Sequence, residues 1–247
     1  MPTADRPGPS RSARTAVVWE ALRDVVGRSG HGPLDVLDVG GGTGGFAVPL
    51  AALGHQVTVV DPSPDALASL QRRAGEAGVA VRAVQGDAAG LLDVVEPGSA
   101  DLVLCHGVLE HVDDVGPAVT SLVAVLRPGG TLSVLVAQRN AVVLARAIAG
   151  RFAEARHALD DPEGRWGAGD PMPRRFTEAA LLDALTGAGL AVEAVHGVRT
   201  VADLVPGGLV DHEPGAADAL VALELATSQR PELRAVATQL HVLATRS

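Results

Sequence analysis

The sequence has no lysine, no tyrosine and few aromatic side chains, with three phenylalanines and two tryptophans in 247 residues. Apolar residues nevertheless make up 47% of the chain, so any core must be built from valine, leucine and alanine. This apolar share excludes a chain that is disordered throughout, and the glycine content excludes a collagen-like repeat. The length allows one α/β domain with additions, and we expect a single domain over 1–247.

Cysteine and long apolar runs are scarce too. Cys105 is the only cysteine, so the chain cannot form an internal disulfide, and its neighbours in DLVLC predict a buried strand position. No run of 18 apolar residues occurs, and the first 14 residues contain no apolar signal segment. From these features we expect a cytoplasmic protein that makes no contact with membranes.

Positive charge is also limited. All 20 basic residues are arginine, and the net charge is -9. An acidic chain has no global positive field that would gather a phosphate backbone, so binding to nucleic acid would require a local arginine patch.

Short β-rich runs alternate with segments of helical spacing along most of the chain. This alternation predicts a parallel sheet covered on both faces. A helix is expected first, within residues 10–30, with apolar residues on one face. The predicted strands cover 34–39, 56–60, 79–84, 100–105, 131–137, 191–198 and 240–245.

Local signals mark where the helices start and stop. Ser63 before Pro64 predicts a helix start, Thr177 another, and Pro117 a third. The segment Pro128-Gly129-Gly130 is expected to close the helix that Pro117 opens. A helix is also predicted over 140–150, and another over 216–228. Residues 138–176 break the alternation and, being too long for a simple connection, are predicted to form a lid or acceptor segment.

The first predicted strand leads directly into a run of glycines, Gly40-Gly41-Gly42-Thr43-Gly44-Gly45. Glycines between a strand and a helix let a ligand approach the backbone, and the spacing matches G-x-G-x-x-G. That pattern alone would suit a dinucleotide. Asp38, just before the glycines, changes the prediction, because a carboxylate there suits a positively charged ligand better than a pyrophosphate. S-adenosylmethionine carries both an ammonium and a sulfonium.

Two more carboxylates follow successive strands. Asp61 ends the second strand, where it could accept both hydroxyls of an adenosine ribose, and Asp87 follows the third, near the backbone of Ala88. Loops after parallel strands share the carboxyl edge of a sheet, so these acids and the glycines should lie together. Either one alone could equally be a helix cap or turn residue.

Three titratable side chains, His106, Glu110 and His111, follow the fourth strand. On a helix His106 and His111 would point about 140° apart, so the three cannot converge on a metal ion. We therefore expect no metal. His106 is placed at the strand end against the cofactor or acceptor, with Glu110 and His111 shaping the floor of the site. His111 alone suits a purely structural role.

Taken together, these residues resemble class I S-adenosylmethionine-dependent methyltransferases. The resemblance covers residues 34–137 and implies a doubly wound, Rossmann-like sheet of seven strands whose last strand is antiparallel. The motifs that carry it are LDVGGGTG, Asp61, GDA, DLVLCHGVLEHV and LRPGGTLSVLV.

A wider resemblance extends to the tRNA 5-carboxymethoxyuridine methyltransferases, which esterify a carboxylate on a wobble uridine. It implies that Arg14 binds the cofactor carboxylate, that His106 lies in the cofactor site, and that Arg199 lies at the acceptor mouth. The chain departs from that group at Ala137-Gln138, where the group has Tyr-Asn, and after Arg199, where aromatic and histidine residues are missing. The shared features are ARTAVVW, LCHGVLEHV, AIAGRF, GVRTVADL and ALELAT.

The predicted function is methyl transfer to a carboxylate or hydroxyl of either a tRNA wobble base or a small molecule. A carboxylate needs no base, whereas for a hydroxyl His106 is the candidate catalytic base. Arg139 and Arg199 are the predicted acceptor-binding residues, and Arg174 and Arg175 suit a solvated surface better. An NAD-dependent oxidoreductase and a non-catalytic cofactor-binding partner are the alternatives. The expected cofactor residues are Arg14, Asp38, Gly40, Gly41, Gly42, Gly44, Asp61, Pro62, Asp87, Ala88, Cys105 and His106.

Overall fold

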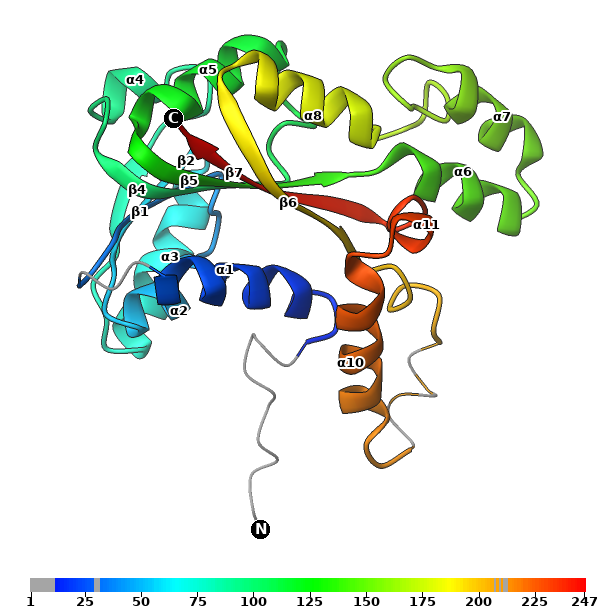
Figure 1. Ribbon diagram of the computed structural model, residues 1–247, viewed down its shortest axis with the longest axis horizontal. Coiled ribbons are helices and arrows are strands. Elements are labelled where there is room, and N and C mark those ends of the chain that lie inside the picture. Colours follow the sequence, from blue (N-terminus) through cyan, green and yellow to red (C-terminus); the bar gives the residue numbers. More distant parts are fainter. Residues whose placement is uncertain (1–11, 29–31, 207, 209, 211–212) are drawn as a thin grey trace.

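The computed structural model describes residues 12–28, 32–206, 208, 210 and 213–247. Seven strands of this described part form one sheet in the order β3-β2-β1-β4-β5-β7-β6 (Figure 1). The first five strands along the chain are parallel, and β7 runs antiparallel to both neighbours, which confirms the predicted fold. The strands are β1 Asp35–Val39, β2 Gln56–Asp61, β3 Arg82–Gln85, β4 Ala100–His106, β5 Leu126–Ala137, β6 Leu190–Val198 and β7 Gln239–Arg246.

Helices cover both faces of this sheet. One core cluster packs β1, β2 and β4 against the face that α1, α2 and α3 cover, and the other packs the opposite face beneath α4, α5 and α8 (Figure 1). The helices are α1 Ala16–Arg28, α2 Ala47–Ala52, α3 Pro64–Glu76, α4 Leu91–Val94, α5 Val115–Val125, α6 Arg139–Ile148, α7 Phe152–Asp160, α8 Glu178–Gly187, α10 Ala216–Ser228 and α11 Pro231–Arg234.

Two of the predicted helix starts are confirmed. The Ser63 hydroxyl accepts the amide of Ala66 at 3.2 Å, and the Thr177 hydroxyl accepts the amide of Ala180 at the same distance. Each satisfies one of the amides that a helix start leaves unpaired. The predicted helix within residues 10–30 is α1, and residues 10, 11, 29 and 30 lie outside the described part.

The expectation for Pro117 was wrong. α5 begins two residues earlier, at Val115, because the Asp114 carboxylate accepts the amide of Gly116 at 3.0 Å and caps the helix there. The Pro128-Gly129-Gly130 segment does not close that helix either. The helix ends at Val125, and the segment lies within β5, which starts at Leu126.

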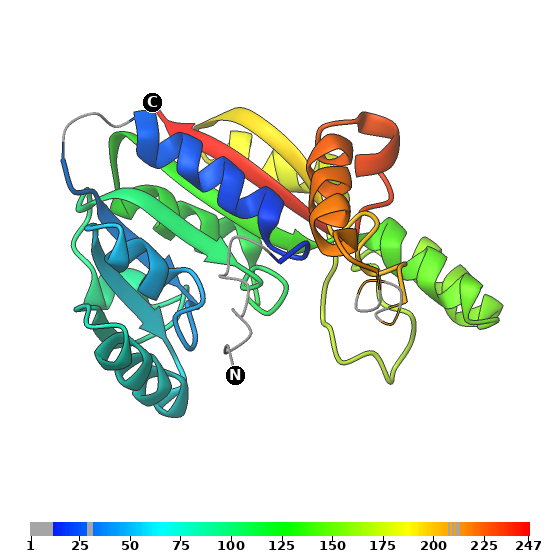
Figure 2. The same cartoon turned by 90° about the horizontal axis from the view of Figure 1, so that it is seen from below.

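The helices α6 and α7 form a hairpin that projects from the carboxyl edge of the sheet (Figure 2). No residue of α6 is buried, and Ile148 and Phe152 near the bend are 76% and 72% exposed. Residues 161–176 then return to the sheet, where Gln138 and Phe176 form an isolated bridge. The α6–α7 hairpin thus extends beyond the carboxyl edge of the sheet. None of the described helices is long and apolar enough to cross a membrane.

Candidate functional site

The glycine run turns sharply as it leaves β1. Gly40, Gly42 and Gly44 have φ angles of 71°, 54° and 82°, in the left-handed region that favours glycine. A Cβ on Gly40 would lie 2.3 Å from Cγ2 of Val108 in the loop after β4, and one on Gly41 would lie 2.6 Å from the Asp38 carboxylate. The backbone therefore packs directly against the strand ends, and side chains are excluded from this turn.

Asp61 connects the end of β2 to this turn. Its Oδ2 accepts the amide of Gly42 at 2.9 Å, and its Oδ1 accepts the amide of Ser63 at 2.9 Å. The side chain is buried, and each oxygen has a second lone pair for a ligand. Asp61 thus orients the glycine turn as well as facing the space beside it.

Asp38 is buried below the turn and has no hydrogen-bond donor among the described side chains and amides. Burial, and then the charge of Asp61, raise the pKa of its carboxyl to about 7. Two carboxylates close together in a low-dielectric region favour a cation. The predicted reason for an acid at position 38, a positively charged ligand, is consistent with this geometry.

A cavity of about 650 Å³ opens beside the glycine turn at the carboxyl edge. Five of the predicted cofactor residues line it, namely Gly40, Asp61, Pro62, Asp87 and Ala88. The opposite wall comes from the loop after β4 and the start of α5. Its residues include Val108, His111, Val112 and Pro117.

His111 is an exposed side chain on that wall, which supports its predicted place in the floor of the site. Val108 and Pro117 were not predicted as site residues. Val108 lies two residues after the fourth strand, whereas Pro117 lies in the first turn of α5, which the structure alone brings to the cavity. Asp87 also holds its own loop, because its Oδ1 accepts the amides of Ala89 and Gly90 at 3.0 and 2.8 Å.

Cys105 lies elsewhere. Its side chain belongs to the core cluster on the α5 face and is completely buried, which confirms the predicted strand position. Burial, followed by the charges of Glu110 and Asp38, raises the pKa of its thiol. The structure therefore gives its thiol no contact with the cavity.

His106 ends β4 on the opposite face of the sheet from Cys105. Its Nε2 lies 2.9 Å from the Ser133 hydroxyl, and its ring packs edge-on against Phe46 at 4.8 Å between centroids. Burial lowers the pKa of the imidazole to about 3. Such a group accepts a proton poorly at neutral pH, so the geometry gives little support to a role as general base.

The Glu110 side chain contacts the end of β5. Its Oε1 accepts the amide of Ala137 at 2.7 Å, and burial raises the pKa of the carboxyl. Among the described residues, no three histidine, cysteine or acidic side chains form a group that could hold a metal ion.

Arg14 and Arg199, predicted from separate motifs, are brought together by Asp203. The carboxylate lies 2.7 Å from Arg199 and 3.7 Å from Arg14. Arg199 is the only described residue other than glycine with a positive φ, 59°. A non-glycine residue in this region is strained, and such strain often marks a functional position.

The loop after Arg199 is held by Glu224 of α10. This carboxylate is completely buried and accepts three successive amides, from Thr200 at 3.1 Å, Val201 at 2.7 Å and Ala202 at 2.6 Å. The motifs GVRTVADL and ALELAT are thus joined in space by the hydrogen bonds of Glu224. Sequence reasoning noted both motifs but did not predict Glu224 as a site residue.

Residues 138–176, the predicted lid or acceptor segment, are held by ion pairs. Asp170 is buried and contacts Arg175 through two hydrogen bonds of 2.6 and 3.1 Å, and it also accepts the amides of Trp166 and Met172 at 3.0 Å. Arg174 pairs with Glu163. The expectation that Arg174 and Arg175 are solvated was wrong, because their side chains are only 20% and 10% exposed.

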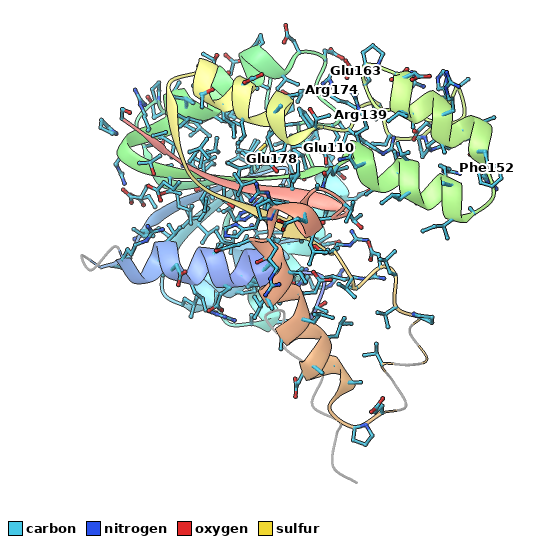
Figure 3. All side chains as sticks on the ribbon, turned by 45° about the vertical axis from the view of Figure 1, so that its right-hand side comes forward. Glu110, Arg139, Phe152, Glu163, Arg174 and Glu178 are labelled. Atoms are coloured by element: carbon cyan, nitrogen blue, oxygen red, sulfur yellow. The ribbon has the colours of Figure 1, made fainter. Side chains whose placement is uncertain are left out.

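Arg174 also connects this segment to the wall of the cavity. It donates to the carbonyl of Val112 at 2.9 Å and to that of Leu109 at 3.4 Å. Arg139 donates to the carbonyl of Pro162, and its Nε is buried without a partner among the described residues. Figure 3 shows Glu110, Arg139, Arg174 and Glu163 close together where the segment meets the sheet, and Phe152 at the far end of the hairpin.

The chain is similar to methyltransferases in sequence. It matches the family described as "Methyltransferase domain" over residues 37–134. It is 32% identical over 195 residues to the tRNA 5-carboxymethoxyuridine methyltransferase of Escherichia coli O157:H7, covering 77% of this chain and 72% of that protein. It is 33% identical over 226 residues to the ubiquinone biosynthesis O-methyltransferase of Methylobacterium nodulans, covering 80% and 86%.

Solved structures share the fold. An S-adenosylmethionine-dependent methyltransferase from Mesorhizobium loti superposes with a TM-score of 0.64 at 22% identity, covering 95% of this chain and all of that one. Magnesium protoporphyrin IX methyltransferase from Synechocystis, with SAH bound, gives 0.63 at 16% identity, covering 100% and 90%. The sequence relatives, which are methyltransferases, overturn the nicotinamide alternative.

Proposed function

The chain belongs to the class I S-adenosylmethionine-dependent methyltransferases, and from this premise we propose that it esterifies the carboxylate of a small-molecule acceptor. S-adenosylmethionine is the cofactor, and when bound it supplies an activated methyl group on a positively charged sulfur. The chain's own residues have three tasks: to bind this cation, to hold the acceptor in line with the methyl group, and to keep water out.

The residues at the cavity suit this cofactor. Asp38 and Asp61 place two buried carboxylates beside the glycine turn, and no cationic side chain of the described residues neutralises them. Gly40, Asp61, Pro62, Asp87 and Ala88 line the space in which we place the adenosine. Asp61 has free lone pairs for the ribose hydroxyls, and Asp38 would face the charged end of the cofactor.

One observation carries the choice of a carboxylate acceptor, namely the environment of His106. Burial lowers the pKa of this imidazole, the predicted base, to about 3, so it accepts a proton poorly, and its Nε2 is already engaged by Ser133. A hydroxyl acceptor has to lose a proton, whereas a carboxylate arrives ionised and needs none. The geometry therefore favours a reaction that consists of positioning alone.

Arg199 and Arg139 are the proposed contacts for the acceptor carboxylate. Each has a buried Nε without a partner among the described residues, and each is otherwise held in place, Arg199 by Asp203 and Arg139 by Pro162. A guanidinium with a free donor suits a carboxylate. Arg14 is proposed to bind the carboxylate of the cofactor.

The arginines near the carboxyl edge favour a small acceptor over tRNA. Arg174, Arg175 and Arg199 each pair with a carboxylate of the chain, which leaves little positive charge for a phosphate backbone. Stacking side chains for a base are also scarce. The wobble carboxylate of a tRNA remains the second candidate, because a relative with that name is 32% identical over most of the chain.

The test is transfer of labelled methyl groups from S-adenosylmethionine into a lysate, followed by separation of RNA, protein and small molecules. Label in the small-molecule fraction that mild alkali releases as methanol would support a methyl ester. Alkali-stable label would indicate a hydroxyl acceptor and contradict the carboxylate proposal. Nuclease-sensitive, alkali-labile label would identify the tRNA carboxylate instead.

A further inference from the structure

A line of polar side chains crosses the sheet on the face that α1 covers. Starting at His106, it passes to Ser133 at 2.9 Å, to His241 at 2.8 Å and to His196 at 3.2 Å. The amide nitrogen of Gln229, at the end of α10, lies 3.4 Å from Nε2 of His196. We call these five residues, His106, Ser133, His241, His196 and Gln229, the histidine array.

The array joins the cofactor side of the sheet to its opposite edge. Ser133 and His241 are completely buried and His196 nearly so, whereas Gln229 is exposed. His196 and Gln229 line a second cavity, of about 470 Å³, between α1 and β6. Buried polar groups destabilise a fold unless they form hydrogen bonds with one another. The groups of the array do so, and we therefore ask what this connected set of side chains does.

The surroundings of all three imidazoles favour the neutral form. Burial is the main cause that lowers the pKa of each of them, and it is assisted at His196 by Arg234 and at His241 by the other two histidines. Asp24 acts in the opposite direction on His196 but does not reverse the shift. A neutral imidazole has one N–H donor and one acceptor nitrogen, and a hydroxyl has one O–H.

With these numbers of donors, the hydrogen bonds of the array can all run from Gln229 toward His106 or all in the reverse direction. The contact at Gln229, the exposed end, decides between the two. An amide nitrogen can only donate, so with that of Gln229 facing it, Nε2 of His196 is the acceptor. Nδ1 of His196 then carries the proton and donates to Nδ1 of His241. Nε2 of His241 then donates to Ser133, and Ser133 donates to Nε2 of His106. The proton of His106 is consequently on Nδ1.

Nδ1 of His106 is the one nitrogen of the array that is buried without a partner among the described residues. An unpaired buried N–H destabilises a structure, and such groups in native proteins call for an explanation. This one belongs to the last residue of β4, at the carboxyl edge of the sheet.

We propose that Ser133, His241, His196 and Gln229 are positioning residues that hold His106 with its proton on Nδ1, so that it offers the anionic acceptor a hydrogen-bond donor instead of a base. The role at the acceptor rests on the proposed function. The direction of the array does not, because it is argued from the amide nitrogen of Gln229 that faces Nε2 of His196.

Histidine tautomers can be read directly from the ¹⁵N shifts of the two ring nitrogens. We would label the histidines of the full chain, assign His106 by its loss in His106→Gln, and record long-range ¹H–¹⁵N spectra at pH 8 without ligands. A protonated Nδ1 and a bare Nε2 are expected for His106. A protonated Nε2 in the unmodified protein would overturn the inference.

Gln229→Glu provides the sharpest variant, because it is an exposed change at the far end of the array. A carboxylate can only accept, so His196 would have to donate to it through Nε2, and every donor along the array would reverse. His106 should then carry its proton on Nε2. Gln229→Ala is the matched control without a competing acceptor, and Ser133→Ala combined with Gln229→Glu should block the reversal at His106.

Kinetic measurements test the proposed role of His106 at the acceptor separately from its tautomer. Reversal by Gln229→Glu should lower kcat/KM for the carboxylate acceptor about tenfold, the effect of losing one hydrogen bond to a charged group, with the KM for S-adenosylmethionine unchanged. An unchanged tautomer in this variant would overturn the array. A reversed tautomer with unchanged kcat/KM would overturn the role at the acceptor. Failure to methylate any carboxylate would refute the proposed function, while the tautomer result would stand.

Discussion

The two sides of the carboxyl edge differ in whether their charged side chains are paired within the chain. On the proposed cofactor side, Asp38 and Asp61 lie close together without a cationic partner among the described residues. On the acceptor side, Arg175 pairs with Asp170, Arg174 with Glu163, and Arg199 with Asp203. Negative charge is thus left open for a cation, while positive charge is almost neutralised within the chain. The first arrangement suits S-adenosylmethionine, and the second leaves only a few directed donors for an acceptor.

The largest expected effect comes from breaking the best-buried pair on the acceptor side. Asp170→Ala leaves Arg175 without its partner and two amides without an acceptor, so the free energy of unfolding should fall by about 3 to 5 kcal/mol. Asp160→Ala, which removes an exposed partner of Arg156, should change it by less than about 0.5 kcal/mol. Urea unfolding measures both. Equal effects would show that the pair does not hold the acceptor segment.

The support of Arg199 should matter next. Glu224→Ala removes the acceptor of three amides, and the loop that carries Arg199 loses its shape. We expect kcat/KM for the acceptor to fall about a hundredfold, with the affinity for S-adenosylhomocysteine unchanged. Glu224→Gln, which keeps one acceptor oxygen, should have a smaller effect, and exposed Glu232→Ala should have none. Loss of cofactor affinity in Glu224→Ala would contradict this division.

The cofactor side can be tested through backbone shape. Gly40→Ala places a Cβ 2.3 Å from Val108 at a φ of 71°, whereas Gly45→Ala meets nothing within 4 Å. Strain of about 1 to 3 kcal/mol should weaken the binding of S-adenosylhomocysteine about tenfold to a hundredfold in the first variant only. Calorimetric titration compares them. Equal affinities would show that the turn can move without loss.

Asp38 also introduces a pH dependence, whose effect between pH 6 and pH 8 is the smallest of these. Its carboxyl has a pKa of about 7 in the folded chain and an ordinary value of 3.8. The folded state therefore holds the proton more tightly, and this group's contribution to stability is lost as the pH rises from about 4 to 7. Binding of a cation favours the ionised form, so affinity for S-adenosylmethionine should rise with pH by up to about tenfold per unit below 7.

Asp38→Asn is the control for this pH effect. Removing the titrating group should flatten both the pH dependence of binding and that of stability, as measured by titration and by urea unfolding at pH 6 and pH 8. A slope that persists in this variant would assign the effect to another group.

That the glycine turn and the acids would meet at one edge was predictable from the sequence. Asp38, Gly40, Asp61 and Asp87 lie at or just beyond the ends of the first three strands, and parallel strands bring their carboxyl ends to one edge. The acceptor side was predicted less well. Arg174 and Arg175 were expected to be solvated, and nothing in the local pattern revealed that Asp170 is buried beside them.

The sequence by itself determined the alternation of strands and helices, the glycine turn and the acids at the strand ends, because each depends on neighbours within a few residues. Only the tertiary structure decided the partners of the arginines and the line of the histidine array. His241 lies 108 residues after Ser133 and is the register partner of His196 in the antiparallel pair. A shift of one residue would turn these side chains to the other face, so their meeting depends on strand register, which local patterns do not specify.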